Sequence, residues 1–189
     1  MKIFQTNPKS ENLLYQEEIE KALIKVSRSG NYILGEEIEL LEVEFASYIG
    51  TKYAVGVGSG TDAIEISLRA LGIGIGDEVI TVAHTAVATV AAIEACGAKA
   101  VLIDIEEDFY TICPRQLEEV YTSRTKAIIA VHLYGQSCNL DEIQEFCSKK
   151  KVDLIEDASQ AHGAKYKNKK LGNFGRVACF SCYPTKNLG

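Results

Sequence analysis

Two ionisable residues near the end of the chain could together hold a cofactor. Asp157 closes one apolar run, residues 152–157, and Lys186 follows another, residues 177–183. A lysine amine can form an imine with an aldehyde, and a carboxylate can keep a pyridine nitrogen protonated. The pair predicts a pyridoxal 5'-phosphate (PLP) site, with Lys186 in the covalent link and Asp157 on the ring nitrogen. Taken singly, a solvated lysine and a turn-capping aspartate are the ordinary interpretations.

The segment GSGTD has the composition of a phosphate-binding turn. Gly58 and Gly60 would let the backbone approach an anion. Ser59 and Thr61 add hydroxyl groups, and the helix that follows would present free amides. The alternative is an ordinary strand-to-helix turn capped by Thr61 or Asp62. A dinucleotide fingerprint is disfavoured because its third glycine would fall on Thr61, and no P-loop lysine follows.

Four other side chains could border the same cofactor. Ser181 is a second candidate phosphate ligand, and Gln160 could contact the ring hydroxyl. His84 and His162 could stack on the ring or border it. His132, at the end of an apolar run, is interpreted as structural.

The composition is that of a globular protein and gives no reason to expect nucleic-acid or membrane binding. Of the 189 residues, 47% are apolar and 24% are charged, and the net charge is −6. The N-terminal residues lack the apolar core of a signal peptide. The only CxxC among six cysteines, Cys179 and Cys182, has its two thiols on opposite faces of a predicted strand. We therefore expect a cytoplasmic protein with buried free thiols and no metal site.

Apolar periodicity predicts an α/β protein in which strands and helices alternate. The expected helices are residues 15–29, 36–48, 61–71, 85–96, 114–121 and 140–150. The expected strands are residues 53–57, 78–82, 98–104, 126–133, 152–157 and 177–183, and the basic run at 165–170 is expected to form a solvated hairpin. Continuous apolar strands separated by helices predict a three-layer α/β/α fold around a mostly parallel sheet. Such sheets bind ligands at the carboxyl ends of their strands, where most of the candidate residues fall.

Five stretches together resemble the DegT/DnrJ/EryC1/StrS family of sugar-nucleotide aminotransferases. They are ILGEEIELLEVEFASYIGTKYAVGVGSGTDAI, LRALGIGIGDEVITVAHTAVATVAAIEACGAKAVLIDI, VHLYGQSCNLDEI, IEDASQAHGAKYKNKKLGNFG and CFSCYPTKNLG, and they follow the family order over residues 30–189. The resemblance implies the large PLP-binding domain of fold type I aminotransferases at residues 36–189, after an N-terminal helix and arm at residues 1–35. Family members continue into a smaller C-terminal domain, so we expect the large domain to be incomplete here.

The resemblance carries site residues over one by one. Lys186 would form the covalent link, Asp157 would meet the pyridine nitrogen, and Gln160 would meet the ring hydroxyl. The phosphate would be held by Ser59, Gly60, Thr61 and Ser181. The family's sugar dehydratases have histidine at the position of Lys186, which favours an aminotransferase.

One departure concerns the face of the cofactor ring. The family often has an aromatic residue where this chain has Ala86, so either His84 or Val87 would cover the ring, or the packing differs.

By the same resemblance, the chain would be an enzyme that moves an amino group from glutamate to a keto-sugar carried on a nucleotide. The setting would be amino-sugar, lipopolysaccharide or antibiotic-sugar biosynthesis, and the assembly would be a homodimer. The alternative is a truncated, catalytically incompetent fragment, or a non-catalytic domain of the same family that binds cofactor weakly or only dimerises.

Overall fold

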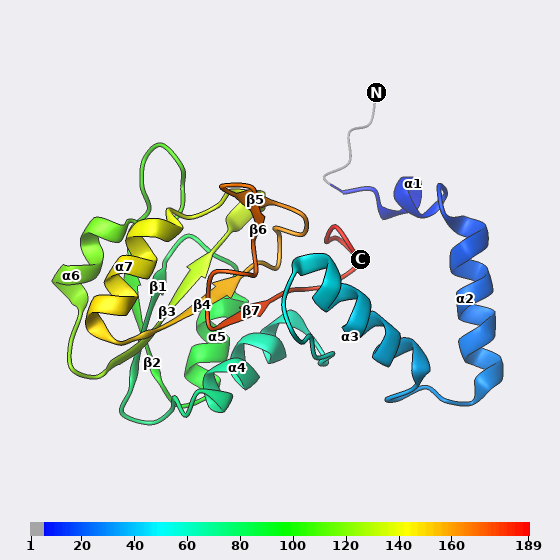
Figure 1. The fold of residues 1–189 in the computed structure, drawn as a ribbon, viewed down its shortest axis with the longest axis horizontal. Coiled ribbons are helices and arrows are strands. Elements are labelled where there is room, and N and C mark those ends of the chain that lie inside the picture. The colour runs from blue at the N-terminus through cyan, green and yellow to red at the C-terminus, as the bar shows by residue number, and fades with distance from the viewer. Residues whose placement is uncertain (1–5) are drawn as a thin grey trace.

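The computed structural model describes residues 6–189, and their centre is a five-stranded sheet (Figure 1). The strands run in the order β2-β1-β3-β4-β7, and every neighbouring pair is parallel. Their bounds are Glu78–Val82 (β1), Lys99–Ile103 (β2), Thr125–Val131 (β3), Asp153–Asp157 (β4) and Val177–Cys179 (β7). The predicted α/β fold with a parallel sheet is confirmed.

Four helices cover the two faces of this sheet. α4 (Gly60–Ala70) and α5 (Val87–Ala95) pack together on one face, and α6 (Leu117–Val120) and α7 (Leu140–Lys150) lie on the other (Figure 1). The division follows from right-handed crossovers, because the chain steps from β1 to β2 in one direction and from β2 to β3 and β4 in the other. The three layers expected from the sequence are therefore present.

The core explains why the strands read as continuous apolar runs. All five residues of β1 and six of the seven residues of β3 are buried, since helices cover both faces. Ile80, Ile128 and Ile155 lie on three adjacent strands and are completely buried. This packed centre gives the loops at the carboxyl ends of the strands a rigid base.

The N-terminal part is helical and lies largely outside this core. α1 (Pro8–Asn12) and α2 (Gln16–Ser29) stand apart from the sheet in Figure 1, and α2 has no buried residue. α3 (Glu36–Ile49) packs closer, through Ala46 and Ile49. Gly30 ends α2 in the left-handed region, at φ 73°, a conformation that glycine adopts without a steric penalty.

The predicted basic hairpin is confirmed. β5 (Lys165–Tyr166) pairs antiparallel with β6 (Lys169–Lys170). The two turn residues, Lys167 and Asn168, have φ of 47° and 65°, as a two-residue turn with the strand twist requires.

Three predicted elements differ in the structure. Residues 53–57 are extended but pair with none of the described strands, and Val55 is 76% exposed. The run 177–183 is a strand only as far as Cys179, and the run 114–121 is a 3-10 turn, η1 (Pro114–Gln116), followed by the short α6. Residues 53–57 were predicted to be a strand from their apolar composition. Among the described residues, β7 pairs only with β4, and the free edge of β7 and residues 53–57 line the same cleft without pairing.

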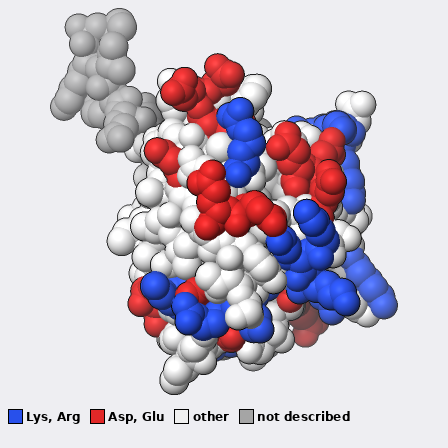
Figure 2. Space-filling view, turned by 90° about the vertical axis from the view of Figure 1, so that its left-hand side faces the viewer, with Lys and Arg blue, Asp and Glu red and all other residues white. Residues whose placement is uncertain are grey.

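Charged side chains of both signs are interspersed on the side of the molecule that carries α6 and α7 (Figure 2). Lys150 of α7 contacts Glu118 of α6 at 2.6 Å, and Lys167 pairs with Asp141. Among residues 6–189, no helix combines the length and the apolar character that crossing a bilayer requires.

Candidate functional site

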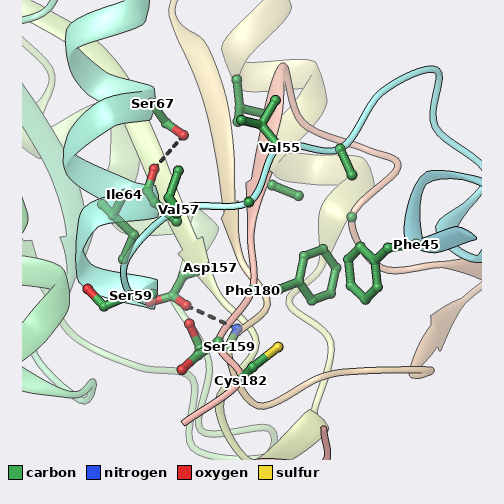
Figure 3. Close-up of a pocket in the computed structure, with 18 of the residues that line it drawn as sticks. Phe45, Val55, Val57, Ser59, Ile64, Ser67, Asp157, Ser159, Phe180 and Cys182 are labelled. Atoms are coloured by element: carbon green, nitrogen blue, oxygen red, sulfur yellow. Dashed lines mark hydrogen bonds between the residues drawn. The ribbon is translucent and has the colours of Figure 1, made fainter. Parts of the chain in front are cut away.

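An open cleft of about 1560 Å³, called here the main cleft, lies between the extended residues 51–59, the outer edge of β7 and residues 180–189. It reaches the carboxyl ends of β3 and β4. Of the side chains predicted for the site, seven line it: Ser59, Gly60, Thr61, Asp157, Gln160, Ser181 and Lys186. Figure 3 shows Ser59 at the end of one helix, near Asp157 and Ser159. The fold therefore gathers residues from three separate segments, 59–61, 157–160 and 181–186, into one site.

The predicted phosphate turn meets Ser181 directly. A Cβ atom placed on Gly60 would lie 2.9 Å from Ser181 Cβ and 3.2 Å from Ser181 Oγ, so only glycine permits this packing. Gly60 and Thr61 open α4, and their amides have no carbonyl within the helix to bond. The Ser181 hydroxyl accepts the Tyr183 amide at 3.3 Å, which leaves its own proton for another acceptor. These donors form a cradle suited to an anion.

In this structure Ser59 caps a helix, and its contact with a phosphate stays a prediction. Its hydroxyl accepts the Asp62 amide at 3.1 Å and donates to the Asp62 carboxylate at 2.9 Å, so Ser59 is the N-cap of α4. The alternative caps considered from the sequence, Thr61 and Asp62, are wrong. Because a hydroxyl has one proton, Ser59 Oγ would have to leave Asp62 before it could donate to a phosphate.

Asp157 ends β4 and is held at both carboxylate oxygens. Its Oδ2 accepts the Thr89 hydroxyl at 2.9 Å, and its Oδ1 accepts the Ser159 amide at 3.2 Å, the contact drawn in Figure 3. Asp157 is only 5% exposed and still lines the main cleft. A carboxylate fixed in this way can face a ring nitrogen without reorganising.

Lys186 lies on a turn beyond β7. Its amide donates to the Tyr183 carbonyl at 2.7 Å, and its own carbonyl accepts the Gly189 amide at 3.0 Å. The side chain is half-buried and lines the main cleft together with Asp157. The structure therefore brings the two residues that suggested the cofactor into one space.

His84 and Gln160 both contact Tyr134, in a neighbouring loop. His84 is absent from the lining of the main cleft and borders a smaller cavity of about 480 Å³, where its ring packs edge-on against Tyr134 at 5.9 Å. Gln160 Oε1 accepts the Tyr134 amide at 3.0 Å and lines the main cleft. A role for His84 at a cofactor stays a prediction.

The position at which an aromatic side chain was expected to cover the cofactor ring is occupied by Ala86. Ala86 lines the main cleft, whereas Val87 is 83% exposed and is absent from the lining. The suggestion that Val87 covers the ring is wrong in this structure, because α5 begins at Val87 and turns its side chain to solvent.

A buried ion network lies behind Asp157. Glu156 and His132 are completely buried, with His132 Nε2 at 3.2 Å from Glu156 Oε2. Glu156 also accepts the amides of Gly172, Phe174 and Gly175 at 2.7–2.8 Å. Burial by itself raises the pKa of Glu156, but the bonds from His132, Gly172 and Gly175 outweigh burial and hold that pKa below its usual value.

The same network confirms that His132 is structural. Its Nδ1 accepts the Cys138 amide at 3.2 Å, so Nε2 carries the proton that faces Glu156. Both ring nitrogens are thus occupied inside the protein.

His162 also lies outside the main cleft lining. Its ring packs against Phe180 at 5.3 Å and Phe45 at 6.4 Å, and burial lowers its pKa. Both ring nitrogens are buried without a hydrogen-bond partner among residues 6–189. Of the cysteines, Cys179 is buried at the end of β7, Cys182 is exposed beyond it, and all six are free.

Sequence reasoning missed Thr89, Ser159 and Glu156. The signal for Thr89 was its spacing of four from Thr85 within the predicted helix 85–96, although α5 begins after Thr85 in the structure. Glu156 could have been separated from Asp157 by strand alternation, since neighbours on a strand point to opposite faces.

Comparison with known proteins bears on this site. The model of the DegT/DnrJ/EryC1/StrS aminotransferase family matches residues 14–189. The chain belongs to this family. A relative from Aneurinibacillus thermoaerophilus, a dTDP-3-amino-3,6-dideoxy-alpha-D-galactopyranose transaminase, is 49% identical over 170 residues, which cover 90% of this chain and 47% of the relative.

Similar solved structures agree with this family membership. Streptomyces venezuelae DesV superposes with a TM-score of 0.94 at 44% identity, over 97% of this chain and 49% of DesV. A putative sugar aminotransferase of Streptococcus pneumoniae, Spr1654 in its PLP form, gives a TM-score of 0.84 at 31% identity, over 87% of this chain and 45% of Spr1654. The chain thus spans about half the length of the relatives it matches.

Proposed function

We propose that this protein acts as a PLP-dependent aminotransferase that delivers an amino group to a keto-sugar carried on a nucleoside diphosphate. The observation that carries the proposal is the shared cleft: Lys186, Asp157 and the Gly60–Ser181 cradle line one space. Family membership and the transaminase activity of the Aneurinibacillus relative support it.

The residues present fit PLP. The cradle offers the two free amides of α4 and the Ser181 hydroxyl to a phosphate, and Gly60 leaves room where a Cβ would intrude. Asp157 offers a fixed carboxylate to a ring nitrogen, and the half-buried Lys186 offers an amine. The PLP form of Spr1654, with a similar fold, is consistent with this assignment.

Each group would have a distinct task. When bound, PLP supplies an electron-poor ring that accepts the electron pair released at a substrate carbon. Asp157 would keep the ring nitrogen protonated, and Gln160 would bond the ring hydroxyl. Lys186 Nζ would hold the cofactor and then take up and return the proton of the substrate carbon that carries nitrogen. The Ser181 and α4 donors would fix the phosphate, with Ser59 and Thr61 beside them.

The finer points of the proposal rest on family membership. Glutamate would be the amino donor, the unit would be residues 36–189 with an arm at residues 1–35, and two copies would associate as a homodimer. Cys182 is exposed and unpaired, as in a reducing compartment, which favours the cytoplasm. Light scattering that finds a monomer at all working concentrations would refute the proposed homodimer.

The test of the proposal is covalent uptake of PLP at one lysine. Wild-type chain, Lys186→Ala and the exposed-lysine control Lys165→Ala are titrated with PLP, reduced with borohydride, and digested for mass spectrometry. We expect a saturable visible absorbance and an adduct confined to the peptide of Lys186, both lost in Lys186→Ala and kept in Lys165→Ala. An adduct spread over surface lysines, or no saturable uptake, would refute the proposal and favour a non-catalytic domain.

A further inference from the structure

A pair of threonine hydroxyls lies behind Asp157, outside the groups assigned so far. Thr89 is completely buried and donates to Asp157 Oδ2 at 2.9 Å. Its hydroxyl also lies 2.9 Å from the hydroxyl of Thr85, four residues earlier and just before the start of α5. Thr85 lines the main cleft, whereas Thr89 does not, so Thr89 can act on a ligand only through Asp157.

The direction of this chain of hydroxyls follows from proton counting. A threonine hydroxyl has a single proton, and that of Thr89 is given to Asp157. Thr89 must therefore accept the proton of Thr85, and the order is Thr85 to Thr89 to Asp157. Thr85 is left with only lone pairs to present to the main cleft.

The contact also fixes the plane of the Asp157 carboxylate. Thr89 holds Oδ2, and the Ser159 amide holds Oδ1 at 3.2 Å, so neither oxygen can rotate without breaking a bond. Thr89 lies in the first turn of α5, which packs on the sheet, and Ser159 follows β4. The carboxylate is thus held by hydrogen bonds from two separate parts of the rigid core, α5 and the segment after β4.

We propose that Thr89 is a positioning residue that orients Asp157 toward the ring nitrogen of the cofactor, with Thr85 orienting Thr89 in turn. This inference rests on the proposed function. It assigns to the two threonines of the TAVAT segment a task that neither the phosphate cradle nor Lys186 performs.

The chain offers a matched set of variants. Thr89→Val keeps the shape and removes the hydroxyl, while Thr89→Ser keeps the hydroxyl. Thr81→Val is the control, because Thr81 is also completely buried and donates its hydroxyl to the Ile129 carbonyl at 3.1 Å. It reports the loss of a buried hydrogen bond on the same sheet without any contact to Asp157.

The experiment measures PLP affinity by titration and the protonation of the cofactor ring by 15N NMR with ring-labelled PLP. We expect Thr89→Val to weaken PLP binding about tenfold, as for loss of a hydrogen bond to a charged group, and to move the ring 15N signal toward the unprotonated position. Thr89→Ser and Thr81→Val should keep both wild-type values.

Each possible result of this experiment either supports or overturns the role of Thr89. A Thr89→Val protein with wild-type affinity and ring signal overturns the inference, and so does an equal loss in Thr81→Val. If Thr89→Val does not fold, Thr85→Val replaces it, and a wild-type ring signal in that variant overturns the relay. A wild-type chain that takes up no PLP refutes the proposed function itself, and the inference falls with it.

Discussion

Replacing Glu156 with glutamine should destabilise the protein more than any surface carboxylate exchange. The wild-type carboxylate accepts four donors in a completely buried place: Oε1 takes the amides of Phe174 and Gly175, and Oε2 takes Gly172 and His132. In Glu156→Gln one of the two oxygens becomes an NH2 group. Two buried donors then face a third donor, and two charge-assisted hydrogen bonds are lost.

The magnitude follows from those two bonds. Hydrogen bonds to a charged group contribute roughly 1.5–3 kcal/mol each, so the loss of two is about 3–6 kcal/mol of unfolding free energy. For a chain of this size, at about 2–4 °C per kcal/mol, that corresponds to a fall in melting temperature of about 6–24 °C. The control is Glu145→Gln on the exposed side of α7, which should change the unfolding free energy by less than about 0.5 kcal/mol.

The same pair of proteins gives a pH test with a defined sign. The bonds listed above keep the folded-state pKa of Glu156 below its unfolded value of about 4.3, so the carboxylate stabilises the fold above that pH. This stabilisation is lost as pH falls through the folded pKa. Urea unfolding at pH 7 and at successively lower pH should show the gap between wild type and Glu156→Gln closing in acid. Equal stability at pH 7, or a gap that widens in acid, would refute the reasoning.

Two further predictions concern the cradle and His162. Gly60→Ala should lose about 1–3 kcal/mol of unfolding free energy and bind phosphate or PLP more weakly, because the added Cβ would lie 2.9 Å from Ser181 Cβ. Gly74→Ala is the control, because its added Cβ would meet only the Cys96 carbonyl oxygen, at 3.4 Å. Calorimetry on both variants checks this prediction. Burial lowers the pKa of His162 in the fold, so stability should decline as pH drops below about 6.5, and His162→Phe should flatten that decline between pH 7 and 5; an unchanged slope in thermal melts contradicts it.

Much of the fold could be predicted because periodicity reflects burial on both faces of a parallel sheet. β1 and α7 coincide with the predicted segments, since their ends carry strong local signals such as the first-turn acids Asp141 and Glu142. Residues 53–57 failed because a strand is defined by its neighbour, and composition does not report whether a neighbour is present.

The site was partly visible in the sequence for a similar reason. Asp157 and Lys186 stand out by type and by position after apolar runs. The contact of Gly60 with Ser181 and the bond of Thr89 to Asp157 depend on how distant segments pack, and no local pattern encodes them. His84 also follows a strand of the sheet, but its ring borders the smaller cavity and not the main cleft, so its role at a cofactor stays a prediction.

The contact between Gly60 and Ser181 also determines when, during translation, the anion-binding cradle can form. α4 and the first four strands of the sheet are all translated before Ser181, and domains form from the N-terminal side as the ribosome releases them. A nascent chain that has emerged only through β4 therefore carries the helix amides but lacks the opposing hydroxyl. The two sides of the anion-binding cradle can therefore meet only after the segment that carries Ser181 has left the exit tunnel.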